Sequence, residues 1–95
     1  MLSKTPIIID KVRPGDRDKE ILRLAIIAEL DAMNLYEQLA NMTTNADLKA
    51  VLLDVTKEEK THAGEFQTML LRLDPEQAEE LLNGKKEVED LVGEG

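Results

Sequence analysis

Glu59 and His62 are the residues whose types and spacing point to chemistry, because they interrupt an otherwise apolar pattern. Members of this pattern follow one another at alternating intervals of four and three residues, which is typical of a helix that packs on another helix. They are Leu48, Leu52, Val55, Glu59, His62, Phe66, Met69 and Leu73. Burying a carboxylate and an imidazole costs free energy unless they pair or coordinate a metal, and Glu-x-x-His places both on one helix face about one turn apart. The segment therefore predicts a metal site.

A carboxylate also interrupts an earlier apolar pattern with the same alternating intervals. Its members are Leu22, Ala25, Glu29, Ala32, Tyr36 and Leu39. The turn-like residues 41–45 separate the two patterns, which predicts an antiparallel pair of helices. Counted from the middle of that turn, Glu29 lies about as many residues back as Glu59 lies forward, and each residue rises about 1.5 Å along a helix. We therefore expect Glu29, Glu59 and His62 to converge on one point between the helices.

These three residues amount to half of a known type of site. Di-iron carboxylate bundles take a Glu from each of two helices and a Glu-x-x-His pair from each of the other two. This chain supplies one Glu and one such pair, namely Glu29 and Glu59-x-x-His62. Two copies related by a twofold axis would complete a four-helix bundle that holds two ions at the interface. The predicted functional unit is a homodimer.

Composition narrows the class of protein. The chain has 95 residues, enough for one small domain, and no cysteine, so the strong metal ligands available are oxygen and imidazole, which suit iron, manganese or zinc. Twelve basic against twenty acidic residues give a formal net charge of -8, which disfavours nucleic acid and anionic membrane surfaces as partners. One Phe, one Tyr and no Trp leave an aliphatic core, which favours packed helices. We expect an all-α, cytoplasmic protein without a membrane segment.

The pattern of caps and breaks predicts an antiparallel two-helix hairpin and a short C-terminal helix. The predicted elements are an extended arm over 1–15, a first helix over 16–41, a second helix over 45–73, and one or two short helices over 75–92. Asp16 or Asp18 is expected to cap the first helix, and Asn45 or Thr44 the second.

Two further features concern the later helices. Asp74-Pro75-Glu76-Gln77 reads as the start of a helix, and Asn83-Gly84 as its end. Gly64 lies inside the second helix, where it would permit a close contact.

Glu29, Tyr36 seven positions later, and Glu59-x-x-His62 together resemble the ferritin-like superfamily with its rubrerythrin relatives, and most of all the encapsulated ferritins. The likeness covers about residues 15–93 and implies a single half-ferritin domain that dimerises into a ferritin-like four-helix bundle. It further implies a ferroxidase that oxidises Fe(II) to Fe(III) for iron storage and detoxification. Its di-iron centre would lie between subunits with Glu29, Glu59 and His62 as ligands, and zinc, manganese or calcium would be substitutes.

The same resemblance implies an assembly and a location. Encapsulated ferritins form a ring of five dimers, a homodecamer, held as cargo inside an encapsulin shell, so the encapsulin shell protein is the implied partner and a cytoplasmic encapsulin nanocompartment the implied location. Family members commonly end in a short targeting peptide rich in Gly and Leu, of which residues 91–95 retain at most a remnant.

Other candidate residues follow from the likeness. Tyr36 matches a tyrosine that the family places just outside the metal ligands, although it would serve equally to fill the bundle end. Asp31 falls where the family often has a glutamate at which metal enters. Ala28 and Leu35 depart from the pattern, since the family has a further glutamate and a tryptophan there.

Two more acidic residues flank the second apolar pattern. Glu58 and Glu65, seven residues apart, either guide cations to the site or are ordinary solvated charges. Two alternative functions also stay open. One is a rubrerythrin-like peroxide reductase, which would need a separate electron donor because the chain has no cysteine for a rubredoxin centre. The other is a non-catalytic, metal-binding helical adaptor whose buried acids only fix the pairing of helices.

Overall fold

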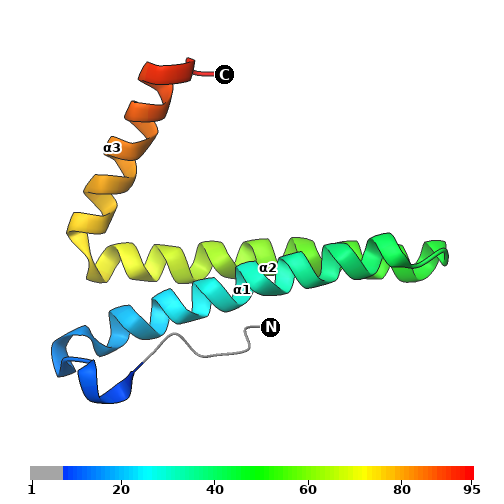
Figure 1. Ribbon diagram of the computed structural model, residues 1–95, viewed down its shortest axis with the longest axis horizontal. Coiled ribbons are helices and arrows are strands. Elements are labelled where there is room, and N and C mark those ends of the chain that lie inside the picture. The colour runs from blue at the N-terminus through cyan, green and yellow to red at the C-terminus, as the bar shows by residue number, and fades with distance from the viewer. Residues whose placement is uncertain (1–7) are drawn as a thin grey trace.

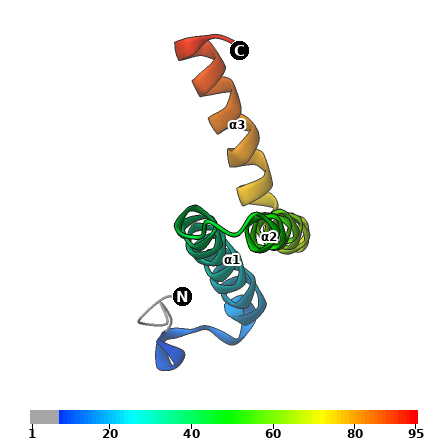
Figure 2. The same cartoon turned by 90° about the vertical axis from the view of Figure 1, so that its right-hand side faces the viewer.

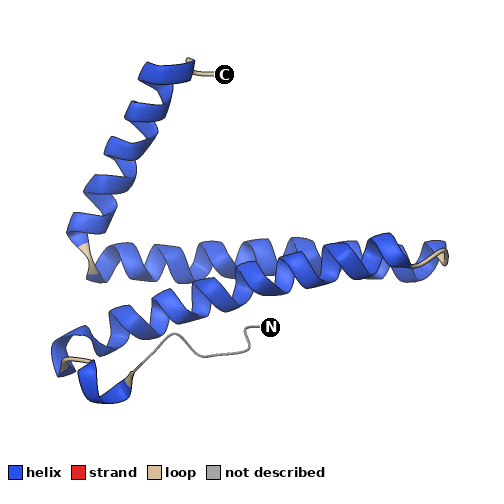
Figure 3. Ribbon diagram, viewed as in Figure 1, coloured by secondary structure: helices blue, strands red, loops and turns tan. Residues whose placement is uncertain are grey.

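The computed structural model describes residues 8–95, and helices account for nearly all of them (Figure 3). In chain order the elements are two 3-10 turns, η1 (Ile9–Lys11) and η2 (Pro14–Asp16), and three α-helices, α1 (Arg17–Met42), α2 (Ala46–Leu73) and α3 (Pro75–Val92). No strand occurs within this part of the chain. The predicted all-α class is confirmed.

Helices α1 and α2 form the expected antiparallel hairpin and lie side by side along their length (Figures 1 and 2). A three-residue turn joins them. The side chain of Asn45 accepts a hydrogen bond of 3.0 Å from the backbone N–H of Leu48, so Asn45 is the predicted cap of α2. The backbone N–H of Asn45 in turn donates to the Thr43 hydroxyl at 3.1 Å. This short turn, held by two hydrogen bonds, keeps the two helices side by side.

The start of α1 differs from the prediction in two respects. Asp16 occupies the N-cap position but makes no side-chain capping bond, because its backbone (φ -103°, ψ -1°) continues the preceding turn and lacks the extended geometry of a capping residue. Its carboxylate lies 3.9 Å from the Lys19 ammonium instead, and Asp18 lies within the helix. The extended arm predicted over 1–15 falls partly on residues outside the described range. Within residues 8–16 the chain forms η1 and η2, since Pro14 fixes a φ suited to a helical turn.

Two glycines lie inside helices without ending them. The predicted stop at Asn83-Gly84 is wrong, because α3 runs on to Val92 and ends where Gly93 adopts a φ of +91°. A glycine inside a helix costs only about 1 kcal/mol, which the flanking helix-forming residues outweigh here. At Gly64 in α2, an added methyl group would meet nothing within 4 Å, so the predicted close contact at this glycine is absent among the described residues.

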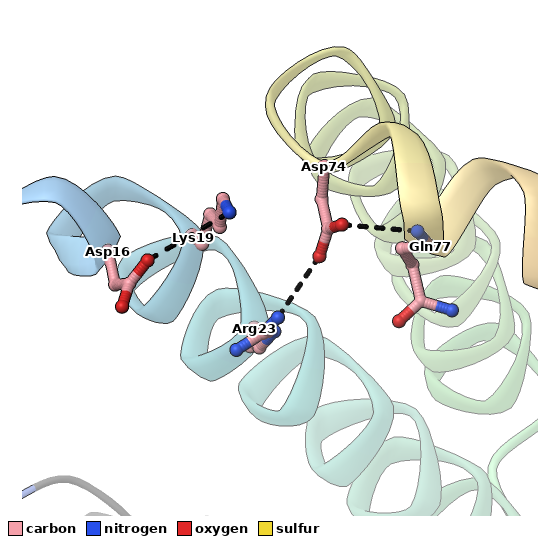
Figure 4. A network of polar contacts seen from close by, with 5 residues as sticks. All are labelled: Asp16, Lys19, Arg23, Asp74 and Gln77. Atoms are coloured by element: carbon pink, nitrogen blue, oxygen red, sulfur yellow. Dashed lines mark hydrogen bonds and ion pairs between the residues drawn. The ribbon is translucent and has the colours of Figure 1, made fainter.

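Asp74 sets the direction in which α3 leaves the hairpin (Figure 4). One carboxylate oxygen, Oδ1, accepts a 3.1 Å hydrogen bond from the backbone N–H of Gln77 and thereby caps α3. The other, Oδ2, lies 3.1 Å from Nη2 of Arg23 in α1. One partly buried side chain thus bonds both the start of α3 and the side of α1 at the point where α3 leaves the hairpin (Figures 1 and 2).

The protomer is far from compact. Its radius of gyration is 16.8 Å, against about 12 Å for a compact domain of this length. Its accessible surface is 7605 Å², against about 5500 Å² for a folded monomer of this mass. Among the described residues only Ala32, Ala40, Thr56 and Leu70 are buried. Most of the other large apolar side chains stay partly in solvent. None of the helices in residues 8–95 has the length and apolarity needed to cross a bilayer.

Candidate metal centre

Glu29 from α1 and Glu59 and His62 from α2 meet between the two helices, as the sequence predicts. Each offers one ligand atom, and these atoms all lie within 4.8 Å of one another. Nδ1 of His62 lies 3.8 Å from Oε2 of Glu29 and 3.6 Å from Oε2 of Glu59. These gaps exceed hydrogen-bond distance but suit atoms arranged around one ion, since ligands about 2.1 Å from a metal lie roughly 3–4 Å apart.

Helix geometry explains why the three side chains coincide. Glu59 and His62 are three residues apart on α2 and therefore share a face. Glu29 is the thirteenth of 26 residues in α1, and Glu59 is the fourteenth of 28 in α2. Because the helices are antiparallel, nearly equal in length and joined by a short turn, their midpoints lie level. The cluster thus occupies the middle of the hairpin.

The cluster is partly buried and open on one side. The side chains of Glu29 and Glu59 are 19% and 18% exposed, whereas that of His62 is 45% exposed. Oε2 of Glu29 is buried, and no donor within the described part of the chain gives it a hydrogen bond. A buried carboxylate oxygen without a donor is costly, and a bound cation would remove that cost. The donor set of two carboxylates and one imidazole fits a divalent transition metal.

Large apolar side chains surround the open side of the cluster. Val51 and Met69 lie eleven residues before and seven residues after His62, so all three share one face of α2. Val51 is 60% exposed and Met69 46% exposed. Leu35 and Leu39 contribute exposed apolar surface from α1. The cluster therefore opens onto an apolar face that a single chain leaves in water.

The weaker candidates do not join the cluster. Asp31 follows Glu29 by two residues, which turns its side chain to nearly the opposite side of α1. Glu58 and Glu65 are exposed on α2, to one side of the ligand face. Tyr36 is partly buried two turns along α1 from Glu29, on the same face. In the part of the chain that the structure describes, no further group of three His, Cys, Asp or Glu residues comes close enough to hold an ion.

Both the sequence and the structure of this chain are similar to those of known proteins. The sequence profile of the family described as Rubrerythrin matches residues 20–92. The crystal structure of the encapsulated ferritin domain from Pyrococcus furiosus superposes with a TM-score of 0.83 at 52% identity, over 98% of this chain and 95% of that one. The hairpin with a third helix is therefore an arrangement already seen in an experimental structure.

Two curated proteins are similar in sequence. The ferritin-like-encapsulin shell fusion protein of Pyrococcus furiosus is 53% identical over 95 residues, which is 98% of this chain and 28% of the relative. The encapsulin nanocompartment cargo protein EncC of Myxococcus xanthus is 53% identical over 57 residues, which is 60% of this chain and 44% of the relative. The chain thus spans less than half the length of each of these two relatives.

Proposed function

Because the chain belongs to the rubrerythrin family of ferritin-like proteins, we propose that it is a ferroxidase whose Fe(II) substrate binds at a di-iron site formed between two copies of the chain. The observation that carries the proposal is the cluster itself. Glu29, Glu59 and His62 come within 4.8 Å of one another, and one buried carboxylate oxygen of Glu29 receives no hydrogen bond from the described residues. Such a cluster is stable when a cation neutralises it.

The second copy supplies what one chain lacks. Two carboxylates and one imidazole fill only part of the coordination sphere of a redox-active ion, and the exposed side of His62 faces outward. The cluster sits at the midpoint of both helices, so a twofold axis through it overlays two hairpins with their ends level. The resulting four-helix bundle has two Glu29, two Glu59 and two His62, the ligand set of a di-iron carboxylate site.

The excess surface of the protomer supports pairing. The accessible area exceeds that of a compact chain of this mass by roughly 2000 Å², which is comparable to the area that a stable pair of proteins buries. The open apolar face around His62 is part of this excess. Covering it would also remove water from the metal site, which strengthens the attraction between the carboxylates and the ions.

Each proposed ligand has a distinct task. Glu29 and Glu59 would hold the iron with their carboxylate oxygens. His62 would ligate through Nδ1 as a neutral imidazole, so it adds no charge to the site in either oxidation state of the iron. Each Fe(II) substrate would give up one electron, and the two electrons, with two protons from water, would reduce dioxygen to hydrogen peroxide. Four carboxylates facing the ions favour Fe(III) over Fe(II) and lower the cost of oxidation.

We further propose that the protein is cargo of an encapsulin nanocompartment in the cytoplasm, with the encapsulin shell protein as its partner and a homodecamer as its assembly. Two relatives of about half identity carry encapsulin in their names, one as cargo and one fused to the shell. Oxidised iron would then be stored outside the bundle, within the shell.

The experiment that tests the function is an anaerobic Fe(II) titration followed by admission of air, read by absorbance and by iron content per chain. We expect two irons for every two chains and rapid formation of Fe(III). Two tightly bound irons in a chain that stays monomeric would contradict the shared site. Oxidation with hydrogen peroxide but not with air would indicate a peroxide reductase, and binding without oxidation would indicate the adaptor.

A further inference from the structure

Met69 lies on the apolar face that surrounds the open side of the metal cluster. It follows His62 by seven residues on α2, so the two residues share one face of the helix, about 10 Å apart along its axis. Side chains of a helix lean toward its N-terminus, which here directs the thioether of Met69 toward the turn that carries His62. Met69 is 46% exposed. An oxidisable sulfur therefore lies between the cluster and the end of the hairpin.

A groove beside Met69 admits small molecules. It lies at the end of the hairpin where α1 begins and α2 ends (Figure 1), and it is lined by Asp18, Ile21, Leu22, Met69 and Leu73. The volume of the groove is about 230 Å³. A water molecule occupies about 30 Å³ of liquid, so hydrogen peroxide, which is only slightly larger, fits in the groove. Among the five lining residues only Met69 is readily oxidised by peroxide.

The other methionines of the described chain lie elsewhere. Met42 is the last residue of α1, thirteen residues or about 20 Å along the helix from Glu29, and it is 77% exposed. Met33 precedes Leu35 by two residues, which turns it to nearly the opposite side of α1 from the apolar face. Within residues 8–95, Met69 is thus the one methionine on the face of the cluster. Met42, which is more exposed but remote from the cluster, is an internal reference.

We propose that Met69 is a site of self-oxidation, at which hydrogen peroxide released from the metal cluster converts the thioether to methionine sulfoxide. This inference rests on the proposed function, which supplies the peroxide as the product of iron oxidation. The sulfur gives two electrons to the peroxide and the O–O bond breaks. One oxygen bonds to the sulfur, and the other leaves as water with both protons.

The source of the peroxide decides which methionine reacts first. Peroxide added to the solution meets side chains according to their exposure, which favours Met42 at 77% over Met69 at 46%. Pairing of two chains at the metal site covers the face of Met69 and strengthens this preference. Peroxide formed at the cluster is instead released beside Met69, within the covered face. Iron oxidation therefore reverses the order of oxidation.

Oxidation of Met69 limits further turnover. A sulfoxide carries a polar oxygen, and Ile21, Leu22 and Leu73 beside it offer no side-chain donor. Burying that oxygen without a hydrogen bond costs free energy, so modified chains pair more weakly at the metal site. Because the site is shared between two chains in the proposed function, weaker pairing lowers the rate of iron oxidation when peroxide accumulates.

The first test compares the two sources of peroxide. The full chain is loaded with Fe(II) without air and then exposed to dioxygen enriched in the heavy oxygen isotope, with catalase present to destroy escaping peroxide. A second sample receives hydrogen peroxide but no iron. Mass spectrometry of peptides locates the sulfoxide, since cleavage after Lys and Arg releases residues 61–72 with Met69 as their one methionine. Heavy oxygen should enter Met69 at least about threefold faster than Met42 in the first sample, and the order should reverse in the second.

Three variants sharpen the test. Glu59→Ala removes a proposed ligand, so any iron that still oxidises does so in solution and the preference for Met69 should disappear. Met69→Leu keeps the face apolar but gives the peroxide no sulfur. Over repeated additions of Fe(II) this variant should retain at least about twice the fraction of its own initial rate that the wild type retains. Met42→Leu is the matched control and should lose activity as fast as the wild type.

The outcomes separate this proposal from the proposed function. If the wild type oxidises iron without placing heavy oxygen on Met69, or oxidises Met42 first during turnover, self-oxidation is overturned and the ferroxidase stands. If the wild type oxidises no iron, the proposed function fails, and the source of the peroxide fails with it. If Met69→Leu loses its rate as fast as the wild type does, the limit on turnover is overturned.

Discussion

The middle of the hairpin and the length of α3 are both incomplete in one chain, but they lack different things. At the middle of the hairpin two carboxylates and an imidazole converge in a partly buried seam, and the missing component is charge compensation. Along α3 the charges are solvated and an apolar stripe is exposed, so the missing component is apolar cover. A cation would complete the first region, whereas only apolar contacts would complete the second.

The largest effect is expected from removing a ligand at the hairpin. Glu59→Ala or His62→Ala should lower the rate of Fe(II) oxidation at least about a hundredfold, because even residues that only support a ligand cost roughly 10–100-fold when mutated. Glu79→Ala on the polar side of α3 is a matched control and should oxidise iron at the wild-type rate. Stopped-flow absorbance after mixing with Fe(II) in air measures both. Wild-type rates in the two ligand variants would remove these residues from the site and favour the adaptor.

Metal removal should show whether a cation links two copies of the chain at the metal site. Without a cation the carboxylates of two facing sites repel one another, so chelation should weaken the pair formed at the metal site by at least about tenfold. Binding of metal at a hundred times its dissociation constant stabilises the bound state by about 2.7 kcal/mol. Native mass spectrometry of metal-free and metal-loaded protein gives the comparison, and an unchanged population of dimers in chelator would refute the metal as a link between subunits.

The hairpin could be predicted from sequence more fully than α3, for a physical reason. Glu29, Glu59 and His62 are related by helix period and by equal distance from one turn, both of which depend on local spacing. The break expected at Asn83-Gly84 failed because glycine only weakens a helix, and the neighbours of Gly84 decide whether it ends. The orientation of α3 depends on Arg23 and Asp74, which are 51 residues apart and show no pattern in the sequence.

The cap of α1 illustrates the same limit. Asp16 has the right residue type at the right position, yet its backbone continues the turn that precedes it, and its side chain makes no capping bond. Asn45 ends the turn between α1 and α2, and Asp74 is the single residue between α2 and α3; both have other backbone conformations and make the predicted capping bonds. Residue type thus predicted caps only where the preceding chain left the backbone free to adopt the capping geometry.

A smaller effect is expected from the residue that joins the two regions. Asp74→Ala removes the cap of α3 and the bond to Arg23, which together should lower the stability of the first turn of α3 by about 1–2 kcal/mol. Hydrogen exchange at the amides of residues 76–79 should speed up by a corresponding factor of about five to thirty, while exchange around the metal cluster stays unchanged. Asp90→Ala, near the other end of α3, is the control for loss of one carboxylate. Faster exchange across the hairpin as well would show that α3 and the hairpin unfold as one unit.

The smallest effects compare one glycine from each region. Gly64 in α2 and Gly84 in α3 both lie in helices, and an added methyl group at either meets nothing within 4 Å. Alanine should therefore favour each helix by about 1 kcal/mol. Because α2 is packed on α1 in a cooperative hairpin, Gly64→Ala should raise the midpoint of thermal unfolding by about 4–8 °C. Helix α3 has little tertiary support in one chain, so Gly84→Ala should increase helicity measured by circular dichroism without moving that midpoint. If Gly84→Ala moves the midpoint as much as Gly64→Ala does, α3 is part of the cooperative unit and the contrast between the two regions fails.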